Sequence, residues 1–132
     1  MPCLTGVLNN SLQAIIDVAV APTSGQAHAK LQNFRALIDT GANRTCITAH
    51  VVQALSLSPI GKLPMRSASH TIDTNIYMVD LGLPFGGIMR LDKGKEVMEC
   101  CDNSEFEIII GMDIISQGTL TVSPDNRFIF CL

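Results

Sequence analysis

The chain has 132 residues, of which 47% are hydrophobic and 16% are charged, and its formal net charge is −3. A chain of this length can bury one proper core and shows no sign of a second, so we predict a single domain over residues 1–132. No basic run is available to neutralise phosphates, which excludes nucleic acid as an expected partner.

The cysteines argue against stabilisation by metal or by a disulfide framework. They are odd in number and contain no Cys-x-x-Cys pair, which is unlike a zinc site or a disulfide scaffold. No basic residue precedes Lys30, and Asp17 interrupts the one apolar run near the amino terminus, so we expect neither a signal peptide nor a membrane span. The default expectation is therefore a reducing, cytoplasmic setting. The five cysteines are Cys3, Cys46, Cys100, Cys101 and Cys131.

In chain order, the first predicted element is a strand over residues 12–20, where apolar residues alternate from Leu12 to Val20. Residues 22–30 form a loop by their Pro, Ser, Gly and Gln content. A second strand, from about Phe34 to Ile38, completes a hairpin. This hairpin leads directly into Asp39.

Residues 37–47 read Leu-Ile-Asp-Thr-Gly-Ala-Asn-Arg-Thr-Cys-Ile. An ionised carboxylate is costly to bury unless it is bonded, so an Asp placed directly after a buried strand needs a purpose. Gly41 allows the backbone to turn sharply and to approach the Asp or a ligand closely. The pattern predicts a carboxylate presented on a tight loop at the end of a core strand, although Asp-Thr-Gly alone is also ordinary turn chemistry.

The middle of the chain predicts a helix followed by strands. Thr48 is suited to cap a short helix that runs through Leu55. Residues 62–83 read as two strands around a polar break at residues 67–71. After a turn at residues 84–87, residues 88–99 predict another hairpin, with Asp-Lys-Gly-Lys in its middle as the turn.

The last part of the chain repeats the pattern seen around Asp39. Residues 106–115 form a β-branched run that ends at Gly111 and passes into a short helix, so strand, glycine turn and helix occur twice. Residues 120–122 and 128–130 predict a final hairpin over Pro-Asp-Asn.

These features resemble the retropepsins, the single-lobe aspartic proteases of retroviruses, retrotransposons and bacteria, and we expect a bacterial member. The resemblance rests on residues 36–42 with Thr45 and Ile47 beyond them, and on residues 109–114 in the second half. It extends over about residues 12–130. It implies an all-β, mainly antiparallel fold with one or two short helices, closed as an acid-protease barrel with one lobe per chain.

The resemblance also implies an activity, that of an aspartic endopeptidase acting on peptides or unfolded proteins. Two copies of Asp39, one from each subunit of a homodimer, would activate a water molecule, supported by Thr40 and Gly41. The strands around the polar break, about residues 65–75, would form a flap over the substrate. No metal or other cofactor is implied. The substrate-binding residues implied are Gly41, Ala42, Asn43, Ile47, Ser69 and His70.

Two departures from the retroviral pattern stand out. The flap segment is not rich in glycine, and Met112 and Asn43 occupy positions where retroviral enzymes commonly pair an Arg with an Asp. Losing both partners together avoids an orphan buried charge. Asp17 and Asp80 are weaker candidates for a second carboxylate, and the match assigns Asp113 to bracing the second loop.

Other chemistries find less support in the sequence. Cys46 lies four residues from His50, but its apolar, strand-like context favours a buried, inert thiol over a nucleophile. The histidines show no metal-ligand spacing. The alternative that remains belongs to another class, a catalytically silent retropepsin-like module for dimerisation or peptide binding.

Overall fold

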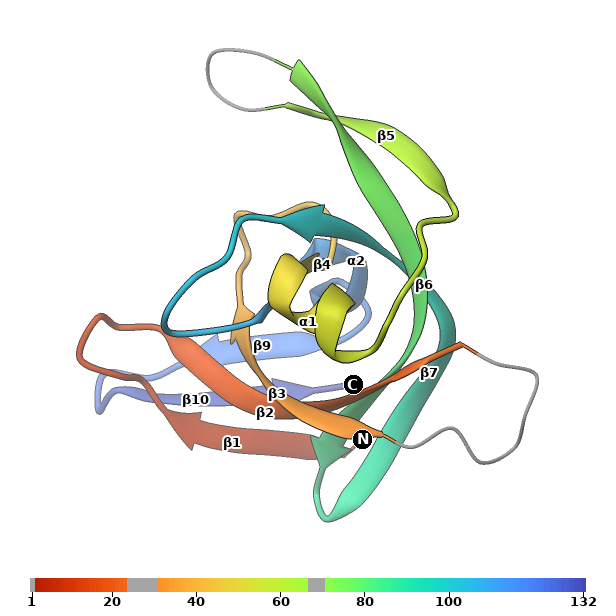
Figure 1. Ribbon diagram of the computed structural model, residues 1–132. Helices are drawn as coiled ribbons and strands as arrows, with labels where there is room; N and C mark the ends of the chain where they lie inside the picture. Colours follow the sequence, from red (N-terminus) through yellow and green to blue (C-terminus); the bar gives the residue numbers. More distant parts are fainter. Residues whose placement is uncertain (1, 24–30, 67–70) are drawn as a thin grey trace.

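The computed structural model describes residues 2–23, 31–66 and 71–132 (Figure 1). Neither helix in this part of the chain is long and apolar enough to cross a membrane. The elements in chain order are β1 (Cys3–Val7), β2 (Ala14–Pro22), β3 (Gln32–Ile38), β4 (Cys46–Thr48), α1 (Ala49–Ala54), β5 (Gly61–Arg66), β6 (Thr71–Phe85), β7 (Ile88–Cys100), β8 (Ile108–Ile110), α2 (Met112–Ile115), β9 (Thr119–Val122) and β10 (Arg127–Cys131).

Six strands close into a barrel in the order β2-β3-β8-β4-β7-β6. The barrel closes because β6 pairs with β2 as well as with β7. Most neighbours are antiparallel, while β3 with β8 and β4 with β7 are parallel pairs. The expected all-β, mainly antiparallel barrel with one or two short helices and one lobe per chain is confirmed, and the described residues form two helices, α1 and α2.

Apolar side chains that point inward from the strands fill the barrel interior. Val18 and Val20 on β2 are at most 1% exposed, whereas Asp17, which precedes Val18, is exposed on the outside of the barrel. Ile108 and Ile110 on β8 are fully buried, so this short strand lies at the centre of the core. Removing these side chains from water is the main driving force for closing the barrel.

Residues 88–99 do not form the predicted hairpin, and that prediction is wrong. They belong to one long strand, β7, whose pairing with β6 shifts register between Val79 and Leu81. Gly94 has a φ of 66°, and its N–H donates to the Asp80 carboxylate at 2.9 Å. A β-bulge takes up an extra residue with positive φ without ending the strand. The turn-like residues of this stretch therefore produce a bulge.

The β5–β6 pair forms a hairpin that projects from the barrel at the top of Figure 1. Its register runs from Gly61 opposite Ile76 to Arg66 opposite Thr71. This confirms the two strands predicted around a polar break. Ser69 and His70, which were expected to contact the substrate, lie outside the described residues.

A three-stranded sheet in the order β1-β10-β9 brings the two ends of the chain together. The β9–β10 hairpin was predicted, but β1 was not. Cys3 on β1 lies directly opposite Cys131 on β10, and a disulfide joins them. The expectation of no disulfide is therefore wrong, because cysteines 128 residues apart in sequence become neighbours only through strand pairing. Disulfides are typical of oxidising settings, so cysteine spacing no longer supports a reducing compartment.

Reducing this disulfide should lower stability without unfolding the barrel. Linking residues 128 positions apart removes conformational entropy from the unfolded chain, which typically stabilises a fold by about 2–4 kcal/mol. We expect the Cys3→Ser, Cys131→Ser double variant to unfold at lower denaturant concentration than the native protein. Reductant should shift the native protein to the same midpoint and leave the variant unchanged. Equal midpoints for oxidised protein and variant would contradict a stabilising disulfide.

Candidate active site

Asp39 follows the last residue of β3 and begins a tight loop. Its N–H donates to the carbonyl oxygen of Ile110 at 2.9 Å, which extends the pairing of β3 with β8 by one residue. The half-buried carboxylate accepts the N–H of Gly41 at 2.8 Å through Oδ1. A Cβ added to Gly41 would lie 3.2 Å from the same oxygen, so glycine allows this close approach. The predicted carboxylate on a tight loop is therefore present.

The loop before α2 supports the Asp39 loop from behind. The N–H of Met112 donates to the carbonyl of Ala42 at 2.7 Å, and the N–H of Asp113 donates to that of Asn43 at 3.2 Å. A Cβ on Gly111 would lie 2.5 Å from the carbonyl carbon of Arg44. The two strand–glycine–helix units recognised in the sequence are thus packed against each other, backbone to backbone.

Asp113 connects these loops to β7. Its Oδ1 accepts the hydroxyl of Thr45 at 2.8 Å and its Oδ2 accepts the Thr45 N–H at 3.0 Å, while Thr45 Oγ1 accepts the N–H of Gly111 at 3.2 Å. Lys95 Nζ lies 3.0 Å from Asp113 Oδ2, and both side chains are only about one-fifth exposed. Sequence reasoning assigned Asp113 to this bracing role but missed Lys95, because it placed that residue in a hairpin turn.

The pKa of Asp113 lies below its ordinary value. Burial acts to raise this pKa, but the hydrogen bonds from Thr45 and the nearby Lys95 ammonium outweigh it. The ionised carboxylate is therefore the form that holds the two loops together. Because the shift is downward, the network survives at mildly acidic pH.

A pH titration of stability tests this network. The folded pKa of Asp113 is below the unfolded one, so its stabilisation is complete above about pH 5 and is lost as pH falls through the lowered folded value. We expect Asp113→Asn to reduce the free energy of unfolding by roughly 1–3 kcal/mol near neutral pH. The difference from the native protein should shrink toward zero in strong acid.

Lys95→Met, as the matched variant, should show a smaller loss and should raise the pKa of Asp113, since one stabilising cation is removed. A difference between native protein and Asp113→Asn that stays constant down to about pH 2 would show that the carboxylate charge is not involved.

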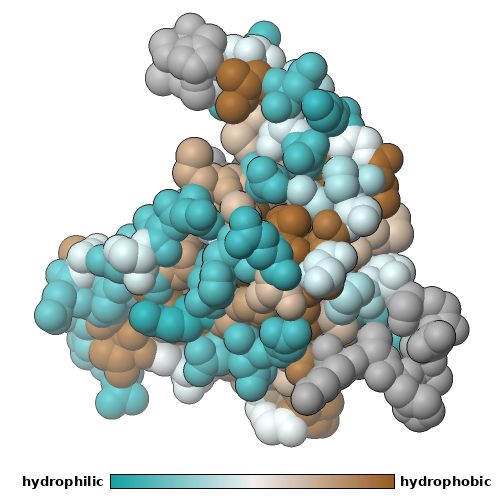
Figure 2. All heavy atoms as spheres, in the orientation of Figure 1, coloured by the Kyte–Doolittle hydropathy of each residue, from teal (hydrophilic) through white to brown (hydrophobic). Residues whose placement is uncertain are grey.

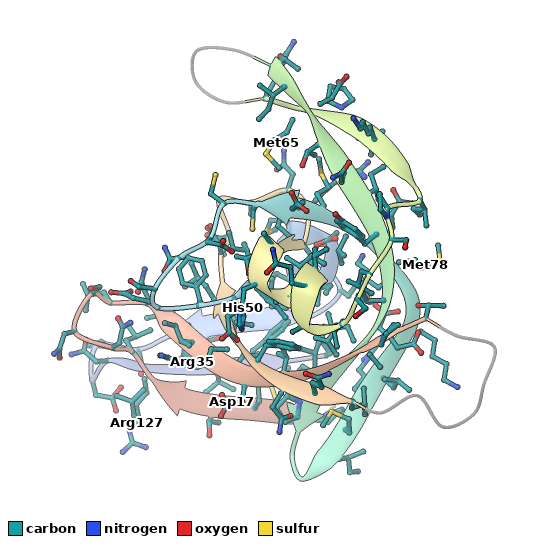
Figure 3. All side chains as sticks on the ribbon, viewed as in Figure 1. Asp17, Arg35, His50, Met65, Met78 and Arg127 are labelled. Carbon is teal, nitrogen blue, oxygen red and sulfur yellow. A yellow bond between two sulfur atoms is a disulfide. The ribbon has the colours of Figure 1, made fainter. Side chains whose placement is uncertain are left out.

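A cleft of about 810 Å³ lies between the Asp39 loop and the β5–β6 hairpin. The surface is hollowed beneath the hairpin in Figure 2, and Figure 3 shows Met65 projecting from the hairpin into this space. Most of its lining is apolar, with Arg44 and Arg66 contributed by opposite walls. The lining residues are Gly41, Ala42, Asn43, Arg44, Cys46, Leu63, Pro64, Met65, Arg66, Thr71, Met98, Cys100 and Ile109.

Some of the predicted site residues line this cleft and others do not. Gly41, Ala42 and Asn43 line the cleft next to Asp39, and Thr40 is exposed on the same loop. Ile47 does not line it, since it is 1% exposed in the core. Its neighbour Cys46 faces the cleft instead, because adjacent residues of a strand point to opposite sides.

Some lining residues were missed by sequence reasoning. Met98 and Ile109 reach the cleft from β7 and β8. The sequence did contain a signal for Ile109, because alternate residues of a strand face opposite sides. With Ile108 and Ile110 buried in the core, Ile109 faces the other way. Nothing local marks Met98, whose position depends on the pairing of β7 with β4.

No hydrogen bond or ion pair joins Asp39 to a second carboxylate within residues 2–23, 31–66 and 71–132. Both oxygens of Asp113 are engaged by Thr45 and Lys95. Asp80 accepts one hydrogen bond from Gly94 in the β6–β7 bulge and one from Thr23. Asp17 lies across the barrel from Met65 in Figure 3. Asp17 borders a separate hollow of about 730 Å³ between β1 and β2. Asp39 is thus the carboxylate on the loop whose next residues, from Gly41 onward, line the cleft, although Asp39 itself is not one of the lining residues.

Metal chemistry has no ready ligand set in this part of the molecule. Among the residues that the structure describes, no three His, Cys, Asp or Glu side chains are grouped to hold a metal ion.

Comparisons with known proteins agree with this geometry. A family model described as aspartyl protease matches residues 24–114, which include the Asp39 loop and the second glycine loop. The crystal structure of a retropepsin-like aspartic protease from Rickettsia conorii is similar with a TM-score of 0.65, covering 97% of this chain and 89% of that chain at 12% sequence identity. At this identity the similarity concerns the fold alone. No curated protein matches the sequence.

Proposed function

Because this chain belongs to the aspartyl protease family and has the retropepsin-like fold, we propose that it is an aspartic endopeptidase that works as a homodimer. Residues 1–132 form a single catalytic domain in this proposal, and Asp39 of each subunit supplies one of two catalytic carboxylates. The observation that carries it is the Asp39 carboxylate, held by the Gly41 N–H on an exposed loop beside a peptide-sized cleft.

The chemistry needs two carboxylates a few ångströms apart. Like charges at that distance cannot both ionise easily, so the pair holds one proton, and aspartic proteases are the standard example of this behaviour. The ionised carboxylate takes a proton from water as the oxygen attacks the peptide carbonyl. The protonated carboxylate gives its proton to the carbonyl oxygen. Collapse of the tetrahedral intermediate then passes a proton to the leaving nitrogen.

A two-fold dimer supplies the second carboxylate. Thr40 and Gly41 are exposed in the isolated chain, at the edge of the loop that carries Asp39. A two-fold axis beside this loop would bring two identical loops together and cover these residues. Thr40 would then bond across the axis and brace both loops.

The substrate in this proposal is an extended peptide with apolar side chains. Within the described residues β5 pairs only with β6, so its other edge leaves backbone groups free for an added strand. Leu63, Met65 and Ile109 give the cleft apolar walls. Folded proteins without a flexible segment would be poor substrates, because the cut stretch must be extended.

A peptide-library assay by mass spectrometry tests the proposal, run over a range of protein concentrations and pH. We expect cleavage at acidic to mildly acidic pH, a fall in rate as the shared proton is lost, and activity that rises with the fraction of dimer seen by light scattering. Cleavage by a monomer, or activity abolished by a metal chelator, would overturn it. Peptide binding without any cleavage would favour the silent module.

A further inference from the structure

Two free thiols, Cys46 and Cys100, lie in one wall of the cleft. In the parallel pair β4–β7, Cys46 lies opposite Met98 and Thr48 opposite Cys100. Residues two apart on a strand share a face, so Cys46, Met98 and Cys100 face the same side. All three line the cleft, and both cysteines lie outside the disulfide.

The two cysteines lie on the same face of adjacent strands, two residues apart in register. The Cys46 thiol donates a hydrogen bond to the carbonyl of Arg44 at 3.4 Å. Hydrogen bonding with the Cys100 side chain lowers the pKa of Cys46 below its ordinary value, although burial and the carboxylates of Asp113 and Asp39 act in the opposite direction. The same interaction, together with burial, raises the pKa of Cys100. Cys46 is therefore the more acidic thiol, and Cys100 is placed to follow it.

We propose that Cys46 and Cys100 are an oxidation site in the substrate cleft, which a hydroperoxide such as hydrogen peroxide converts to an intramolecular disulfide that suppresses peptide cleavage. The loss of cleavage rests on the proposed protease function, whereas formation of the disulfide does not.

The reaction balances as a two-electron oxidation. The Cys46 thiolate attacks one peroxide oxygen, so that an S–O bond forms, the O–O bond breaks and hydroxide leaves as water after taking up a proton. The sulfur of Cys100 then attacks the Cys46 sulfur. The S–S bond forms, the S–O bond breaks, and the oxygen leaves as a second water with the Cys100 proton. Two thiols and one peroxide give one disulfide and two waters.

Disulfide formation should disturb the active-site loop, because it removes the S–H hydrogen of Cys46. The disulfide has no S–H group, so the carbonyl of Arg44 loses its donor on the active-site loop. That carbonyl also lies against Gly111, where a Cβ would be 2.6 Å away, and the contact leaves little room for adjustment. The bridge additionally ties the first residue of β4 to the last of β7 along the cleft wall. Displacement of the Asp39 loop should follow.

Cys101 supplies a matched control, because it is free, exposed and adjacent to Cys100 but does not line the cleft. The native protein, Cys100→Ser and Cys101→Ser should each be treated with stoichiometric hydrogen peroxide. Remaining thiols are alkylated, and the disulfides are mapped by mass spectrometry. The peptide-cleavage rate of each sample is compared with that of its own untreated aliquot, before and after addition of dithiothreitol. Dithiothreitol also reduces the Cys3–Cys131 disulfide, so an unoxidised sample treated with dithiothreitol corrects for that effect.

We expect native protein and Cys101→Ser to form the Cys46–Cys100 disulfide, to lose cleavage rate roughly tenfold or more, and to recover on reduction. Cys100→Ser can form no such disulfide and should lose less rate than the native protein, because its oxidation stops at a Cys46 sulfenic acid, whose O–H can still donate to the Arg44 carbonyl. A Cys100–Cys101 bond, no bond, or the Cys46–Cys100 bond with unchanged rate would each overturn the proposal. Should the untreated protein cleave no peptide, the proposed function fails, while the disulfide map still decides the oxidation site.

Discussion

Replacing Asp39 with asparagine is expected to lower kcat/KM for peptide cleavage by about 10³-fold or more, because an amide can neither take a proton from water nor share one with its symmetry mate. The fold should be preserved. Asparagine keeps a side-chain oxygen that can accept the Gly41 N–H, so the free energy of unfolding should change by less than about 1 kcal/mol.

Asp17→Asn is the matched control and should leave the rate unchanged, since Asp17 is exposed and does not line the cleft. A mixing experiment sharpens the result. If each site needs one Asp39 from each subunit, excess Asp39→Asn protein should inhibit native protein by forming mixed dimers. Full activity of Asp39→Asn, or no inhibition on mixing under conditions of subunit exchange, would show that Asp39 pairs do not carry the chemistry.

Replacing Gly111 with alanine should damage both stability and catalysis. The added Cβ would lie 2.5 Å from the carbonyl carbon and 2.6 Å from the carbonyl oxygen of Arg44, and 3.0 Å from the carbonyl oxygen of Ala42. These are backbone atoms of the active-site loop, so the clash cannot be relieved by rotating a side chain. We expect a loss of roughly 3 kcal/mol or more of stability. The displaced loop should cost about 10²-fold in kcat.

Gly61→Ala serves as the stability control, because a Cβ on Gly61 meets no atom within 4 Å. Its thermal midpoint should match that of the native protein. Kinetics for Gly111→Ala should be measured well below its own midpoint, so that unfolding does not lower the rate. A folded Gly111→Ala with native kcat would show that the contact between the loops does not position Asp39.

Part of the candidate site can be predicted from short stretches of sequence. The turn after β3 depends on a glycine two residues beyond Asp39, and its hydrogen bond spans two residues. The strand faces follow from alternation along β2 and β8. Such features involve near neighbours in the chain, so their residue types predict them directly.

Other features required the assembled barrel. Assigning Ile47 to the substrate and overlooking Cys46 was an error of one residue, and one residue is enough to exchange the two faces of a strand. The turn-like stretch on β7 became a bulge because a partner strand was present to continue the pairing. Composition alone does not distinguish these outcomes.

The sequence by itself determined the Asp39 loop, its echo at Gly111 and the all-β barrel, since each depends on periodicity or on glycine's backbone freedom within a few residues. Only the tertiary structure decided that Cys3 meets Cys131, that Lys95 neutralises Asp113, and that two thiols share the cleft wall. These contacts join residues far apart in the chain. They exist only once strand order and register are set, which is a property of the whole fold.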